Sequence, residues 1–122
     1  MALTIGLMEK PMEWIHWFSR YTLQYIYNML ANNTELGHLY SPVYYRLKRY
    51  DKENGTSYLK TLREYLNCYQ NTAQAAKNLF IQRSTMIYRL KRIREIADND
   101  LTGRDDLLHL YLTFSIIDRQ NQ

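Results

Sequence analysis

The 122-residue sequence is poor in the residues that several fold and function classes require. Cys68 is the one cysteine, so no disulfide can form within the chain and nothing suggests a structural zinc site. Four glycines and two prolines are too few for a sandwich or barrel built from many tight turns. No run approaches the roughly 18 apolar residues of a membrane span, and the first residues lack the basic opening of a secretory signal. We therefore expect a soluble cytoplasmic protein that does not bind a membrane.

Acidic residues are absent from one segment, although the whole chain carries a net charge of only +4. Between positions 77 and 94 every charged residue is basic, namely Lys77, Arg83, Arg89, Lys91, Arg92 and Arg94. A concentrated positive stripe is what a polyanion such as duplex DNA requires. The same charges would suit a helix face that is merely solvated, so the spacing of the residues has to distinguish the two.

Apolar residues at helical spacing predict an all-α fold of five to six helices. The first helix is expected at about residues 12–30 and is apolar over much of its circumference, with Trp14, Trp17 and Tyr21 on one face. A face this wide needs cover from another surface. We expect it to form a homodimer or to contact another domain.

The chain is expected to divide into an N-terminal element, residues 1–41, and a C-terminal DNA-binding domain, residues 42–122. Residues 3–7 suggest a short strand or arm, and residues 35–40 a short helix. The last helix is expected at about residues 105–118.

Residues typical of helix ends divide the C-terminal domain into its helices. Ser41 before Pro42 predicts a helix start, because serine caps helices and proline suits their first turn. Gly55 can adopt the positive φ that ends a helix. Thr56 and Thr72 predict the N-caps of the next two helices.

The segment that begins at Thr72 has the layout of a helix-turn-helix. A short helix at residues 72–79 is followed by a turn and a longer helix at residues 82–97. Three small side chains would let the two helices approach closely: Ala73, Ala75 and Ala76. We expect Leu79 and Phe80 to fill the space between the helices and Ile81 to be buried in the turn.

On a helical wheel the second helix separates a core row from an outward face. The core row consists of Met86, Leu90, Ile93 and Ala97. The outward face carries hydroxyls, a phenol and cations, which suit phosphates and base edges. The residues predicted to contact base edges are Arg83, Ser84, Thr85 and Tyr88. Those predicted to contact phosphates are Thr72, Lys77, Arg89, Lys91 and Arg92, with backbone N–H groups at Thr72 contributing.

The run from Ala75 to Ile93 resembles the signature of the PucR family's C-terminal helix-turn-helix. The specific parts are Arg83-x-Thr85 and Tyr88-Arg89-Leu90-Lys91-Arg92-Ile93. Residues 55–66 resemble the helix that precedes this motif, and the turn and second helix also look like those of Fis-type DNA-binding proteins. The resemblance covers about residues 42–117, with Ile87 where the family often has a basic residue.

This resemblance implies a bacterial transcriptional regulator, of the purine-catabolism or sugar-diacid type, that binds duplex DNA sequence-specifically. Family members often carry a sensor domain upstream, in which case this chain would be the C-terminal piece of a longer regulator. The sequence specifies neither the operator, the effector nor the sign of regulation.

Other chemistries have weaker support, and we expect no enzyme, no catalytic residue, no cofactor and no metal. Asp98 to Gly103 resembles the start of a calcium loop, but His109 stands at the twelfth position, where a bidentate Glu is required. A helix-capping loop explains the same residues. A second function class stays open: a protein-interaction module that keeps the fold and binds a partner through the aromatic helix at residues 12–30.

Overall fold

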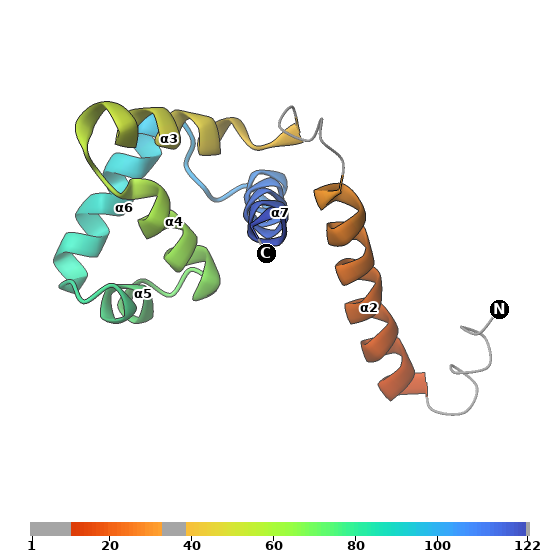
Figure 1. The fold of residues 1–122 in the computed structure, drawn as a ribbon. Coiled ribbons are helices and arrows are strands. Elements are labelled where there is room, and N and C mark those ends of the chain that lie inside the picture. Colours follow the sequence, from red (N-terminus) through yellow and green to blue (C-terminus); the bar gives the residue numbers. More distant parts are fainter. Residues whose placement is uncertain (1–10, 33–38, 122) are drawn as a thin grey trace. The chain divides into compact units, whose positions relative to one another are not determined.

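The structure, a computed structural model, describes residues 11–32 and 39–121, and for residues 11–18 the backbone alone. Within these ranges it contains six α-helices and no β-strand (Figure 1). The helices are α2 (Pro11–Ala31), α3 (Pro42–Asn54), α4 (Tyr58–Asn67), α5 (Thr72–Asn78), α6 (Arg83–Ala97) and α7 (Arg104–Gln120). The all-α prediction is therefore confirmed. The expected strand or arm at residues 3–7 and most of the expected helix at residues 35–40 lie outside the described residues.

The chain divides into two compact units. One unit comprises Met1–Gly37 together with Ser115–Gln122, and the other comprises His38–Phe114. Helices α3 to α6 and the first part of α7 belong to the second unit. Every residue predicted to contact DNA therefore lies in this one unit.

Helix α2 begins at Pro11, whose missing N–H costs nothing in the first turn of a helix. Five of its large apolar side chains are between 37% and 57% exposed, namely Tyr21, Leu23, Tyr25, Ile26 and Met29. Within the same unit, the Arg119 guanidinium of α7 donates to the Asn28 side chain at 3.0 Å and lies 5.2 Å from the centroid of the Tyr27 ring. Among the described residues, no helix has the length and apolarity needed to cross a membrane.

In the second unit, helices α3, α4, α5 and α6 pack around one hydrophobic core. Its largest fully buried apolar side chains are Leu47, Leu62, Leu66, Met86, Ile93 and Leu110. The start of α3 is tied to α7 because the Ser41 amide donates to the Thr113 hydroxyl at 3.0 Å. That hydroxyl in turn donates to the His109 carbonyl at 2.7 Å. The buried Thr113 hydroxyl therefore both accepts and donates a hydrogen bond.

The predicted ends of α3 are confirmed. The Ser41 side chain accepts a hydrogen bond from the Val43 amide at 3.2 Å, and Pro42 takes the first helical position. Gly55 follows the last turn with a φ of 65°, and its amide donates to the Asp51 carbonyl at 2.9 Å. This left-handed conformation suits glycine because it has no Cβ.

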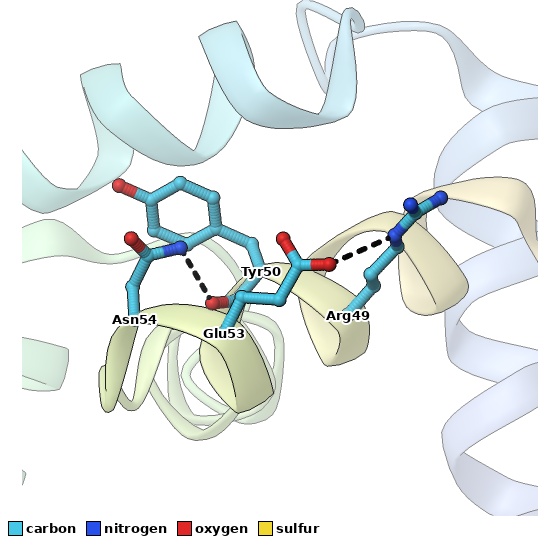
Figure 2. A network of polar contacts seen from close by, with 4 residues as sticks. All are labelled: Arg49, Tyr50, Glu53 and Asn54. Carbon is cyan, nitrogen blue, oxygen red and sulfur yellow. Dashed lines mark hydrogen bonds and ion pairs between the residues drawn. The ribbon is translucent and has the colours of Figure 1, made fainter.

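The exposed side of α3 is polar near its C-terminal end (Figure 2). The Arg49 Nε donates to the Glu53 carboxylate at 3.1 Å, one helical turn away. The Asn54 side-chain amide donates to the Tyr50 carbonyl at 2.9 Å and so satisfies a carbonyl of the last turn. These contacts are local and leave the opposite side of α3 to the core.

The prediction that Thr56 caps α4 is wrong. Ser57 is the N-cap residue but makes no side-chain capping bond. The carboxylate of Asp51, in the preceding helix, instead accepts the amides of Tyr58 and Leu59 at 2.9 Å each. The Thr56 hydroxyl donates to the same carboxylate and helps to orient it. A negative group at the helix N-terminus also complements the helix dipole.

The prediction that Thr72 caps α5 is also wrong, by one residue. Asn71 has the extended backbone of an N-cap, and its side-chain oxygen accepts the Gln74 amide at 3.0 Å. Asparagine is a stronger N-cap than threonine, which explains the choice. Thr72 is consequently the first helical residue.

Candidate nucleic-acid interface

Helices α5 and α6 are joined by a turn of four residues, 79–82. The turn is closed by two hydrogen bonds, from the Phe80 amide to the Lys77 carbonyl at 3.1 Å and from the Ile81 amide to the Ala76 carbonyl at 3.0 Å. This pair defines a Schellman motif, with Phe80 in the left-handed conformation at φ 58°. The turn is therefore held by the backbone itself.

Two of the three alanines predicted to let α5 and α6 approach closely are buried. Ala75 and Ala76 are at most 3% exposed, whereas Ala73 is exposed. The prediction that Phe80 fills the space between the helices is wrong, because its side chain is 95% exposed. The residue reverses the chain after α5, and its side chain points out of the turn. Ile81, expected to be buried, is half-buried.

The predicted core row of α6 is confirmed. Met86, Leu90, Ile93 and Ala97 are at most 3% exposed. They recur at intervals of three and four residues and therefore share one side of the helix. Their burial determines which side of α6 faces outward.

The residues predicted to contact base edges lie in the first two turns of α6. Arg83 and Ser84 are exposed, Tyr88 is 59% exposed and Thr85 is half-buried. The Gln82 side chain makes no capping bond to this end of the helix. The first turn of α6 thus presents polar side chains and backbone N–H groups that lack partners within the helix.

The residues predicted to contact phosphates differ in their surroundings. Lys77 and Lys91 are exposed. Thr72 is half-buried at the start of α5. Arg89 is half-buried and donates to the Thr61 hydroxyl of α4 at 3.4 Å. The exposed lysines are the more accessible of these groups.

Arg92 is held by two neighbours, Tyr50 of α3 and Glu95 of its own helix. Its guanidinium lies 5.9 Å from the centroid of the Tyr50 ring, donates to the Tyr50 hydroxyl at 3.3 Å and forms an ion pair with Glu95. The bond to Tyr50, followed by the bond to Glu95, raises the pKa of Arg92 above its ordinary value. The Tyr50 ring also stacks on Tyr58 at 5.8 Å. Arg92 is thus positively charged and positioned, with 31% of its side chain exposed.

Tyr50 and Tyr58 were not among the residues predicted for this surface. Tyr50 shares the apolar side of its own helix, so helical periodicity predicts burial and gives no sign of the contact with Arg92. The contact joins residues 42 positions apart in the chain. A local sequence pattern contains no information on such a pair.

Groups suited to metal binding or nucleophilic catalysis are sparse in the described part of the chain. No three His, Cys, Asp or Glu side chains there lie close enough to hold a metal ion. Burial, followed by a hydrogen bond to Glu64, raises the pKa of the Cys68 thiol, which disfavours the nucleophilic thiolate. Asp98 ends α6 at φ 51°, and the Asn99 side chain accepts the Leu101 amide at 2.8 Å. The segment that resembles a calcium loop therefore caps a helix.

Residues 58–116 match the model of the PucR C-terminal helix-turn-helix domain. The chain is 40% identical over 76 residues to the proline-responsive transcriptional activator PutR of Bacillus subtilis. This match covers 61% of this chain and 18% of PutR. It is 30% identical over 93 residues to the DNA-binding transcriptional activator AdeR of B. subtilis, covering 76% of this chain and 22% of AdeR. It is 28% identical over 115 residues to the carbohydrate diacid regulator of Escherichia coli, covering 94% of this chain and 29% of that protein.

No solved structure matches the chain significantly. The chain spans less than a third of the length of each of these three relatives. The matched region contains α4, α5, α6 and most of α7, and so includes the turn and the outward face of α6. Residues 58–116 of this chain belong to the PucR family of C-terminal helix-turn-helix domains.

Proposed function

We propose that this chain binds duplex DNA sequence-specifically through α6 and is the DNA-binding part of a longer bacterial transcriptional regulator of the PucR type. One observation carries the proposal. Helix α6 buries one row of apolar side chains, and between Arg83 and Arg94 its remaining surface has basic, hydroxyl and phenol groups and the exposed Ile87, with no carboxylate. A face of this composition offers donors to phosphates and to base edges.

The N-terminal half of α6 is the part that enters the major groove in this proposal. In helix-turn-helix proteins the first residues of the second helix contact base edges. Arg83, Ser84, Thr85 and Tyr88 occupy these positions here. An arginine can bind guanine O6 and N7 in two parallel bonds, and hydroxyls can donate to or accept from several base edges.

The phosphate contacts are assigned to groups on α5 and α6. Lys77 and Lys91 are exposed and can reach the backbone without breaking an internal contact. Arg92 is already oriented by Tyr50 and Glu95, so it loses little side-chain freedom on binding. Arg89 and Thr72 complete the set. Two relatives named as transcriptional activators support DNA binding by this chain.

Selection from a random pool of duplexes tests the proposal. The full chain should enrich a related set of sequences, and its affinity should fall steeply as salt rises, because each phosphate contact releases counterions. Binding that is absent even at about 50 mM salt would contradict DNA recognition. A pool that is bound without enrichment would contradict sequence specificity alone.

A protein-interaction module is the second candidate function. Its supporting observation is the exposure of large apolar side chains on α2, such as Tyr25 at 57% and Met29 at 54%. Exposed apolar patches of this kind mark interaction surfaces. Failure to bind DNA in the pool experiment would favour this candidate.

A further inference from the structure

Two aromatic residues of the second unit combine high exposure with a left-handed backbone. Tyr69 follows α4 at φ 54° and is 88% exposed, and Phe80 follows α5 at φ 58° and is 95% exposed. They are the most exposed of the large hydrophobic side chains that the structure describes. Both occupy the same position of a Schellman motif, since Gln70 donates to the Tyr65 carbonyl at 2.9 Å as Ile81 does to Ala76.

Neither feature helps the chain to fold. Glycine is the residue preferred at this position, and a bulky side chain there is strained. The third motif of this kind, at the end of α6, has Asp98, a polar residue type that tolerates the conformation better. An aromatic ring that is both strained and exposed gains nothing from hydrophobic burial. A strained residue of this kind is more common at a binding surface than elsewhere.

The position of Phe80 distinguishes it from Tyr69. Phe80 lies in the turn that leads directly into α6, between the exposed cations Lys77 and Arg83. The nearest exposed residues in the chain, Asn78 and Gln82, are polar. An aromatic side chain with cationic and polar neighbours fits a charged partner with a small apolar group better than it fits an apolar protein surface.

We infer that Phe80 packs against the C5-methyl group of a thymine in the DNA bound by α6. The inference rests on the proposed function and adds a specificity residue to it. The thymine methyl is the one apolar group among the base-edge features of the major groove, and phenylalanine is among the side chains that contact it. Because the turn is closed by its own backbone hydrogen bonds, the backbone at Phe80 is already positioned before DNA binds.

Replacement of thymine by uracil in the DNA provides the test, because it removes only that methyl group. In the enriched site, one such replacement should weaken binding by the wild-type chain about fourfold, the factor that corresponds to about 0.8 kcal/mol for one buried methyl-sized group. The Phe80→Gly variant should bind the thymine site roughly tenfold less tightly than wild type and should not distinguish thymine from uracil at that position. Its affinity for a scrambled duplex should be unchanged.

Tyr69→Gly is the matched control, since it removes an exposed aromatic ring from the same backbone conformation at the other end of α5. It should leave both affinities and the thymine preference unchanged. Both variants should melt at or above the wild-type temperature, because glycine relieves the strain. Equal affinity of Phe80→Gly and wild type for the enriched site would overturn the inference. An equal loss of affinity by Phe80→Gly for the enriched and the scrambled DNA would also overturn it. Absence of all binding by the wild type would instead refute the proposed function on which the inference rests.

Discussion

Asp51 should be a main determinant of stability, although it lies on no predicted site. Its carboxylate accepts the amides of Tyr58 and Leu59 and the hydroxyl of Thr56, and so caps α4 from a neighbouring helix. Loss of an N-cap costs about 0.5–2 kcal/mol, and partly buried donors left without a partner add to this. We expect Asp51→Ala to lower the free energy of unfolding by about 2–3 kcal/mol, which is large against a typical total of about 5–15 kcal/mol.

Urea unfolding followed by circular dichroism measures this loss, and a neighbouring acid provides the control. Glu53 lies two residues further along α3 and pairs with Arg49 (Figure 2), but their side chains are 60% and 82% exposed. Glu53→Ala should therefore cost less than about 0.5 kcal/mol. Asp51→Asn keeps one acceptor oxygen, so its loss of stability should lie between those of Asp51→Ala and Glu53→Ala. A loss below about 0.5 kcal/mol for Asp51→Ala, or equal losses for the two alanine variants, would refute the capping role.

Leu90 is 3% exposed in the core row of α6, so Leu90→Ala should lower the free energy of unfolding by about 2–5 kcal/mol. An unchanged urea transition would contradict the burial of Leu90. Gly55 has a φ of 65°, and no atom lies within 4 Å of the position that a Cβ would occupy. Gly55→Ala should therefore lower the free energy of unfolding by about 1 kcal/mol from backbone strain alone. A rise in melting temperature would contradict this. The exposed apolar side chains of α2 predict a homodimer, so sedimentation at tens of micromolar without DNA should give twice the 14.8 kDa chain mass, and a monomer would argue against dimer formation.

The sequence predicted the phase of α6 correctly because that helix is amphipathic over 15 residues. Leu90 and its neighbours in the row repeat at helical spacing, and repeated apolar spacing is the strongest local signal of burial. The ends of α3 were predictable for a similar reason. Ser41 before Pro42, and Gly55, are residue types whose backbone preferences specify a helix start and a helix stop.

Interactions between distant residues could not be predicted in this way. Asp51 caps a helix that begins seven positions later, and Arg92 contacts Tyr50 at a separation of 42 positions. Phe80 shows a different failure, because a hydrophobic residue type does not by itself imply a buried side chain. A left-handed residue at a helix end directs its side chain according to the backbone, whatever its polarity. Such positions are detectable from sequence only when glycine or asparagine occupies them.

The outward face of α6 is expected to meet DNA, with some residues on phosphates and others on bases. Two variants separate these roles. Lys91 is exposed, so Lys91→Ala should weaken binding to the enriched site and to a scrambled duplex alike and reduce the slope of log K against log salt by about 0.9. Thr85→Ala should weaken binding to the enriched site by roughly 1–3 kcal/mol and leave binding to the scrambled duplex nearly unchanged.

The decisive measurement is the affinity of wild type and these two variants for both duplexes across a salt series. Arg104→Ala is the control, because Arg104 is exposed at the start of α7, beyond the end of α6. It should leave the salt slope unchanged. We predict a loss on both duplexes for Lys91→Ala and a loss confined to the enriched site for Thr85→Ala. If neither variant differs from wild type in affinity or salt slope, the outward face of α6 does not contact DNA.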